Sequence, residues 1–118
     1  MNHLALAVGD EERSRRFYAT YLGFDARAER MDDGVLMLWN EAGFQLALGP
    51  RDGDLRLPAF LHFGLRLPSP DAVHTLAERL RADGVELVEE WDEPAYVSRK
   101  LKDPDGYVVE VYWEPSRP

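Results

Sequence analysis

Three residues of the types that bind divalent metals lie far apart in the sequence, each on a segment typical of a β-strand. The chain has only three histidines, and His3 and His62 each open a short apolar run, "HLALAV" and "HFGLRL". Glu110 lies within "YVVEVYW", near the end of the chain. Two imidazoles and a carboxylate, with positions left for water or substrate, are a common set for Fe, Mn, Ni, Co or Zn. The same residues also fit a simpler interpretation, as solvated polar side chains at strand ends.

Strand alternation indicates which way these residues point. Side chains along a strand face alternate sides of the sheet. In residues 3–8 the larger apolar side chains share one face, and His3 shares the other with two alanines. The same parity puts Gln45, His62 and Glu110 opposite the larger apolar residues of their own strands. If the strands curl into a common cup, these four polar side chains can converge. The residues expected to face the helices are Leu4, Leu6, Val8, Phe44, Leu46, Leu48, Phe63, Leu65, Leu67, Tyr107, Val109, Val111 and Trp113.

Two helices and eight strands are needed to position these side chains. The first helix is expected within 10–24, beginning at Asp10 and ending at Gly23, and the second within 69–85, beginning at Ser69 and ending at Gly84. The strands are expected at 3–8, 24–30, 34–40 and 44–49 in the first half, and at 62–67, 85–91, 96–102 and 107–113 in the second.

Both halves therefore run strand, helix, strand, strand, strand, with His3 and His62 at matching places. This repeat predicts an α+β fold of two tandem βαβββ modules, forming a cupped, mostly antiparallel sheet with the helices on its outer face. We expect one domain over 1–118, with module one at about 1–50, a linker at about 51–60 and module two at about 61–118. The linker is rich in Gly, Pro and charged residues.

Composition narrows the possible partners. The net charge of −8 argues against nucleic acid, because phosphate binding needs clustered Lys and Arg. No apolar run is long enough to span a bilayer, and no export signal is seen, so we expect no membrane partner and a cytoplasmic location. The absence of cysteine excludes thiolate metal ligands.

The segments "NHLALAV", "RFYATYLGF", "HFGLRL" and "LKDPDGYVVEVYW" resemble the vicinal oxygen chelate superfamily, over nearly the whole chain. That superfamily includes glyoxalase I, extradiol dioxygenases, fosfomycin-resistance thiol transferases and bleomycin-resistance proteins. The resemblance implies metal ligands at His3, His62 and Glu110. The fourth ligand position is Gln45 when counted back from "LALG", and Ala47 when counted from Gly43. The long inserts of glyoxalase I and the phosphonate-binding residues of the fosfomycin enzymes are missing, so the resemblance names no single reaction.

The resemblance implies a small metal-dependent lyase, isomerase or dioxygenase whose substrate chelates one divalent metal through oxygen atoms. Glu110 would also carry a proton, and Tyr112 and Arg99 are the expected substrate contacts. His74 is expected at the surface of the second helix. The resemblance further implies a homodimer in which modules of two chains complete each site. The alternative is a metal-free protein of the bleomycin-resistance type that sequesters a bulky cationic antibiotic or metabolite, which the net charge of −8 and three tryptophans favour.

Overall fold

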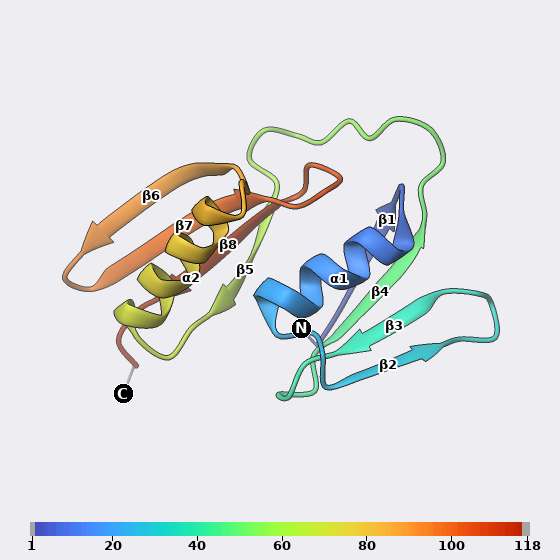
Figure 1. The fold of residues 1–118 in the computed structure, drawn as a ribbon, viewed down its shortest axis with the longest axis horizontal. Coiled ribbons are helices and arrows are strands. Elements are labelled where there is room, and N and C mark those ends of the chain that lie inside the picture. Colours follow the sequence, from blue (N-terminus) through green and yellow to red (C-terminus); the bar gives the residue numbers. More distant parts are fainter. Residues whose placement is uncertain (1, 117–118) are drawn as a thin grey trace. The chain divides into compact units, whose positions relative to one another are not determined.

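A computed structural model describes residues 2–116 and divides the chain into two compact units, Met1–Arg56 (unit 1) and Leu57–Pro118 (unit 2) (Figure 1). Unit 1 contains β1 (His3–Val8), α1 (Glu11–Leu22), β2 (Arg27–Arg30), β3 (Leu36–Trp39) and β4 (Gln45–Pro50). Unit 2 contains β5 (His62–Arg66), α2 (Pro70–Ala82), β6 (Leu87–Glu93), β7 (Tyr96–Lys102) and β8 (Val108–Trp113). The prediction of two βαβββ modules is confirmed.

Each unit has its own four-stranded mixed sheet, with the order β1-β4-β3-β2 in unit 1 and β5-β8-β7-β6 in unit 2. The first and last strands of each unit pair in parallel, and the remaining pairs are antiparallel. The sheets are therefore mostly antiparallel, as expected. This topology makes each strand-opening histidine a neighbour of the last strand of its own unit.

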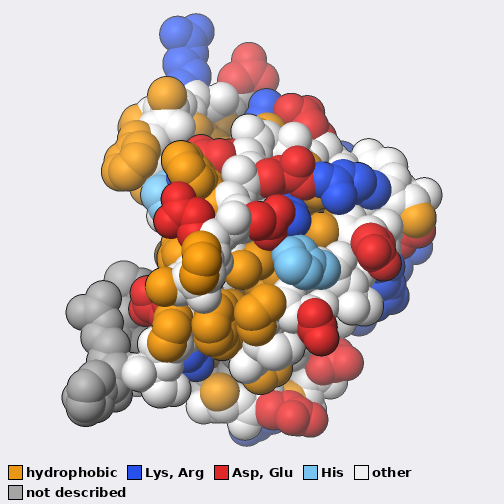
Figure 2. Space-filling model, turned by 90° about the vertical axis from the view of Figure 1, so that its left-hand side faces the viewer, with side chains coloured by type: hydrophobic (Ala, Val, Ile, Leu, Met, Phe, Trp, Pro, Cys, Tyr) orange, Lys and Arg blue, Asp and Glu red, His pale blue; other side chains and the backbone are white. Residues whose placement is uncertain are grey.

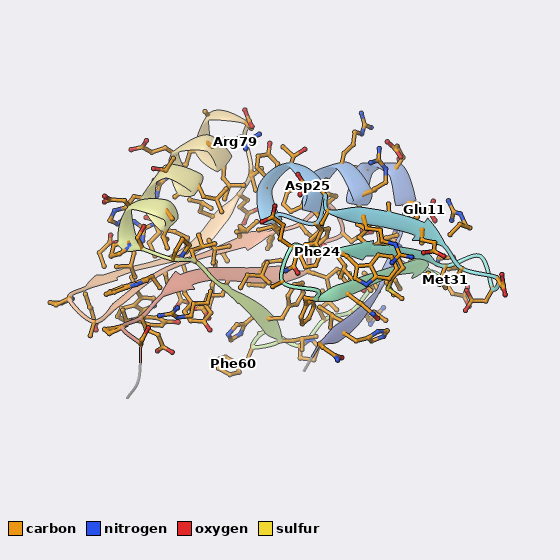
Figure 3. The ribbon with its side chains drawn as sticks, turned by 90° about the horizontal axis from the view of Figure 1, so that it is seen from below. Glu11, Phe24, Asp25, Met31, Phe60 and Arg79 are labelled. Atoms are coloured by element: carbon orange, nitrogen blue, oxygen red, sulfur yellow. The ribbon has the colours of Figure 1, made fainter. Side chains whose placement is uncertain are left out.

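Both helices begin at the residues that the sequence indicates. The Asp10 side chain accepts a hydrogen bond from the Arg13 amide at 3.0 Å, and Gly23 ends α1 with a φ of 79°, which favours glycine. The Ser69 hydroxyl accepts from the Ala72 amide at 3.1 Å at the start of α2. At the start of α1, Glu11 pairs with Arg30 of β2 at 2.7 Å, and Figure 3 shows Glu11 beside β2. Neither helix within residues 2–116 is long and apolar enough to cross a membrane.

One face of each sheet packs against its helix. Residues of α1 contact β4, and residues of α2 contact β7 and β8. The buried apolar side chains follow the predicted alternation, because Leu6 and Val8 are buried while His3 and Ala5 are exposed. The buried apolar residues are, in unit 1, Leu6, Val8, Tyr18, Leu22, Phe24, Leu36, Leu38, Leu46, Ala47 and Leu48, and in unit 2, Val73, Ala77, Leu80, Val97, Leu101, Val109 and Val111. The opposite face of each sheet is left for the polar side chains.

Candidate metal site

In unit 2 the structure brings two of the expected ligands together. His62 and Glu110 lie on the paired strands β5 and β8, and the distance from His62 Nε2 to Glu110 Oε1 is 3.6 Å. Their side chains are 23% and 12% exposed. His62 Nδ1 lies 2.8 Å from the carbonyl oxygen of Phe60. Because a carbonyl can only accept, Nδ1 carries the hydrogen, and in the neutral ring Nε2 directs its lone pair toward Glu110.

This His62–Glu110 geometry suits a cation. A neutral imidazole lone pair and a carboxylate oxygen repel each other unless a proton or a metal ion lies between them. Metal–ligand bonds of about 2.1 Å at angles of about 90–110° put two donor atoms roughly 3.0–3.5 Å apart. Histidines that bind metals usually donate their other ring N–H to a carbonyl or carboxylate, as His62 does to Phe60. The donor types and the hydrogen bond to Phe60 fit one half of a divalent-metal site, and the separation of 3.6 Å is just above the range for two ligands of one ion.

The second carboxylate oxygen of Glu110 is held by two hydroxyl groups of β7. Tyr96 donates its phenolic hydrogen to Oε2, and the Ser98 hydroxyl donates to the same oxygen at 2.5 Å. Burial, and then the hydrogen bond to Glu110, raise the pKa of Tyr96 to about 12. Tyr96 therefore keeps its proton at neutral pH and remains a donor.

Sequence reasoning did not place Tyr96, Ser98 or Lys100 beside Glu110, and it considered Tyr96 only as an aromatic residue that could line a cavity. The Lys100 ammonium lies 3.2 Å from Glu89 Oε2 and 5.8 Å from the centroid of the Phe60 ring. The Phe60 side chain is 82% exposed, and Figure 3 shows it on the side of β5 away from α2. Strand alternation puts residues 96, 98 and 100 on one side of β7, and this much could have been read from the sequence. The β7–β8 register, in which Lys100 pairs with Glu110, then makes it the side of Glu110.

The structure does not bring Arg99, an expected substrate contact, to this face. Its neighbours on the same side of β7, Val97 and Leu101, belong to the core under α2. The Arg99 side chain is 7% exposed and donates two hydrogen bonds to Asp92, at 3.1 and 3.0 Å. It also donates to the carbonyl of Ser98 at 2.9 Å. Alternation explains the difference, since residue 99 must face the side opposite to Ser98.

His74 lies on α2, which packs against the side of the unit 2 sheet opposite to Glu110. It contacts Asp92, the same aspartate that Arg99 contacts. Its Nε2 is 2.9 Å from Asp92 Oδ1, and its side chain is partly exposed, as expected for a surface residue. The hydrogen bonds from Arg99 and then from His74 lower the pKa of Asp92 below its usual value. This group of charges joins α2 to β6 and β7.

Tyr112, the other expected substrate contact, does lie on the Glu110 face. Its ring centroid is 6.0 Å from that of Tyr96. The ring also covers Gly64 of β5, where a Cβ atom would lie 3.1 Å from Tyr112 Cε1. Gly64 therefore leaves the space that the Tyr112 ring occupies.

In unit 1 the structure pairs His3 with Gln45. The two residues are partners in the parallel β1–β4 register, and His3 Nδ1 lies 3.4 Å from the Gln45 side-chain oxygen. Ala47, the other position considered for a fourth ligand, is buried and carries no donor atom. Gln45 is thus the residue within reach of His3.

A cavity of about 400 Å³ opens beside His3 in unit 1. Small residues of the paired strands β1 and β4 line it, including Ala5, Ala7 and Ala47, and methionines of β3 and the β2–β3 turn add apolar wall. Asp33 is the one carboxylate that lines this cavity within the described part of unit 1. The small neighbours of His3 leave room on its face of the sheet for a ligand.

Unit 1 thus holds one pair of donor side chains, His3 and Gln45, and unit 2 holds another, His62 and Glu110. Within residues 2–116, no three His, Cys, Asp or Glu side chains gather closely enough to hold a metal ion by themselves. The donors that the units do present, two imidazoles, one amide oxygen and one carboxylate, are borderline and hard ligands of the types that Mn, Fe, Co, Ni and Zn accept.

The chain resembles known proteins over almost its entire length. It is 34% identical to an uncharacterized protein of Pseudomonas aeruginosa, over 100% of this chain and 91% of that protein. It is 29% identical to a manganese-dependent 2,3-dihydroxybiphenyl 1,2-dioxygenase of Geobacillus genomosp. 3, over 98% of this chain but only 37% of that longer enzyme.

Solved structures share the fold. A possible glyoxalase from Bacillus cereus superposes with a TM-score of 0.79 at 24% identity, covering 94% of this chain and 96% of that one. The fosfomycin resistance protein FosX from Listeria monocytogenes, in complex with Mn(II) and sulfate, superposes with a TM-score of 0.80 at 20% identity, covering 98% and 90%. Residues 1–111 match the glyoxalase/bleomycin resistance protein/dioxygenase superfamily. The chain therefore belongs to this superfamily.

Proposed function

We propose that this protein is a small metal-dependent enzyme in which His3, Gln45, His62 and Glu110 bind one divalent cation. The observation that carries the proposal is the position of His62, whose Nε2 faces Glu110 Oε1 at 3.6 Å while its Nδ1 lies 2.8 Å from the carbonyl oxygen of Phe60. The manganese dependence named for the dioxygenase relative, and the Mn(II) in the FosX complex, support a cation of this class. Fe, Mn, Ni, Co and Zn all accept such a ligand set.

The charge of the proposed site favours a substrate with oxygen donors. Glu110 is the one anionic ligand of the set, so a divalent cation held there would keep a net charge of about +1. When bound, such a cation acts as a Lewis acid that stabilises negative charge developing on a substrate oxygen. The protein would add Lys100, on the same side of the sheet as Glu110, which could contact an anionic substrate group by exchanging its present partner Glu89, 3.2 Å away.

The cavity beside His3 is the place where we expect the remainder of the substrate. Its walls are mainly alanine, methionine and valine side chains, and its volume of about 400 Å³ accommodates a small molecule. Such a lining favours an apolar group and excludes water from it. We therefore expect a substrate that has oxygen donors at one end and a small apolar group at the other.

Metal analysis of protein purified without an affinity tag tests the proposal. We expect about one equivalent of metal per chain after incubation with Mn²⁺, Fe²⁺, Ni²⁺ or Zn²⁺, because binding converts the facing donors into ligands. His62→Ala should lose this metal, whereas His74→Ala, which removes a partly exposed imidazole bonded to Asp92, should keep it. Binding of less than about 0.2 equivalents under all four conditions would refute the enzyme proposal.

A mixing experiment then tests the homodimer. If each site takes its two donor pairs from different chains, His3→Ala and His62→Ala proteins mixed after mild denaturation will form hybrids that hold one intact site. Metal binding should then recover in part. If both pairs come from one chain, the mixture will bind no more metal than its two components do separately. Neither result identifies the residues that bind the metal, which the metal analysis of the histidine variants tests.

The second candidate function is metal-free sequestration of a bulky cationic compound, and two observations favour it. The net charge is −8, and large apolar side chains of unit 2, including Phe60 and Trp91, are exposed. Figure 2 shows exposed hydrophobic side chains bordered by acidic ones. Titration of metal-free protein with a cationic antibiotic such as bleomycin, by calorimetry, tests this function. Tight binding that added metal does not improve would favour sequestration over catalysis.

A further inference from the structure

We propose that Tyr96 and Ser98 are positioning residues that hold Glu110 as a fixed ligand with a single available oxygen. This inference rests on the proposed function for the presence of a cation. The hydroxyl groups of these two β7 residues would determine which oxygen of Glu110 a cation can reach.

The strand register sets up the arrangement. Strands β7 and β8 are antiparallel neighbours, and Tyr96 and Ser98 lie two residues apart, so both side chains face the same side of the sheet as Glu110. Ser98 has no exposed surface, and Glu110 is almost fully buried. Both hydroxyl groups donate to Oε2 of Glu110.

These two hydrogen bonds leave Oε1 as the available oxygen. A carboxylate oxygen has two in-plane lone-pair directions, and the two hydroxyl hydrogens occupy those of Oε2. Oε1 then faces His62 Nε2 at 3.6 Å. A two-oxygen binding mode would require Glu110 to rotate and release both donors, which would leave the buried Ser98 hydroxyl without its acceptor.

The same constraint bears on the proton-carrier role that the family resemblance implies for Glu110. A carboxylate that collects a proton from a substrate must move or must turn a free oxygen toward it. Here one oxygen is committed to two hydroxyl donors and the other faces His62. We therefore assign to Glu110 the role of a rigid ligand, and the proton-carrying group of the reaction must be sought elsewhere.

Measurement of metal affinity in matched variants tests the inference. Metal-free protein is titrated with Zn²⁺ and with Mn²⁺ in competition with a chromophoric chelator, for wild type, Tyr96→Phe, Ser98→Ala and the double variant. Loss of a group that orients a metal ligand typically weakens metal binding by about 10–100-fold, and we expect that range for Tyr96→Phe. Tyr112→Phe is the matched control, because it removes a hydroxyl from the neighbouring ring on the same face. Its metal affinity should stay within about threefold of wild type.

Two further readouts separate positioning from general stability. Cobalt(II) absorption reports coordination number, so a freed Glu110 that binds through both oxygens should alter the visible bands of Tyr96→Phe but not those of Tyr112→Phe. The melting temperature of the metal-free proteins reports stability alone. A lower melting temperature with wild-type metal affinity and a wild-type cobalt spectrum would show a merely structural role and would overturn the proposal.

The outcomes also distinguish this inference from the proposed function. If wild-type protein binds no metal, the proposed function fails and this inference fails with it. If wild type binds metal and Tyr96→Phe binds it equally well with an unchanged cobalt spectrum, only the positioning role is refuted. Tyr96 is partly exposed, so Tyr96→Phe should fold even if the fully buried Ser98→Ala does not.

Discussion

Replacing Arg99 with leucine should destabilise the protein without weakening metal binding. The guanidinium group of Arg99 bonds to both carboxylate oxygens of Asp92 and to the carbonyl oxygens of Trp91 and Ser98. These contacts tie β6 to β7 on the side that faces α2. Leucine retains apolar volume but makes none of them, so the variant isolates the contribution of the polar contacts.

The size of the effect follows from the exposure of each partner. Asp92 and Glu90 are 56% and 43% exposed, so their ion pairs with Arg99 contribute only about 0.3–1 kcal/mol each. The carbonyl groups of Trp91 and Ser98 each lose a hydrogen-bond donor, and each loss costs about 1 kcal/mol of stability or somewhat more. The free energy of unfolding should therefore fall by about 2–4 kcal/mol, which corresponds to a melting temperature lower by about 8–16 °C for a chain of this length.

Circular dichroism during thermal and urea unfolding measures the loss, and chelator competition measures the metal affinity of the same samples. Arg99→Lys is the matched variant, because it keeps the charge but cannot bond to both oxygens of Asp92 and should lose about half as much stability. A loss below about 1 kcal/mol for Arg99→Leu, together with impaired metal or substrate binding, would refute this reasoning. Arg99 would then face the site, as the sequence first suggested.

Three further predictions concern the cavity, a charged pair and a tight contact. Ala47→Leu should fill the cavity beside His3 and weaken binding of a small apolar ligand by about tenfold while leaving metal affinity unchanged, as calorimetry can check. The pKa of Asp92 is lower in the folded state, so its pairing with Arg99 stabilises the protein above the unfolded pKa of about 4 and loses this effect as the pH falls toward the folded value. The melting temperatures of wild type and Asp92→Asn should accordingly differ at pH 7 and converge as the pH falls through the lowered pKa of Asp92, and a constant difference would contradict the pairing. Gly64→Ala should displace the Tyr112 ring by a few tenths of an ångström and change stability by less than about 1 kcal/mol, visible as shifted NMR signals of that ring.

Much of the fold could be predicted from the sequence because the repeat and the helix caps are local signals. Asp10, Gly23 and Ser69 mark helix ends by side-chain and backbone chemistry that needs no tertiary context. Alternation correctly indicated the polar faces of β1 and β8, since one face of each sheet packs on a helix. The boundaries were less well predicted: β2 begins at Arg27 rather than at residue 24.

The candidate site was predicted less completely, because it depends on which side chains of neighbouring strands meet. Arg99 was expected to contact substrate on the strength of its charge, although its parity in β7 places it under α2. The hydroxyl groups of Tyr96 and Ser98 carry no charge, and the sequence offers Tyr96 only as an aromatic side chain that could line a cavity or join the core. Their role becomes visible only once the β7–β8 register puts them beside Glu110.

The parallel pairing of the first and last strands of each unit has a consequence for the order of folding. The contact between His3 and Gln45 spans 42 residues, and His62 and Glu110 are joined in the same way by the two ends of unit 2. Such distant contacts form late, because the intervening chain must first lose its freedom. Neither donor pair can therefore assemble before the last strand of its own unit has paired with the first. Because the proposed site needs both pairs, acquisition of metal would report that both units are complete, and a nascent chain still lacking its last strand would leave the cation for other ligands.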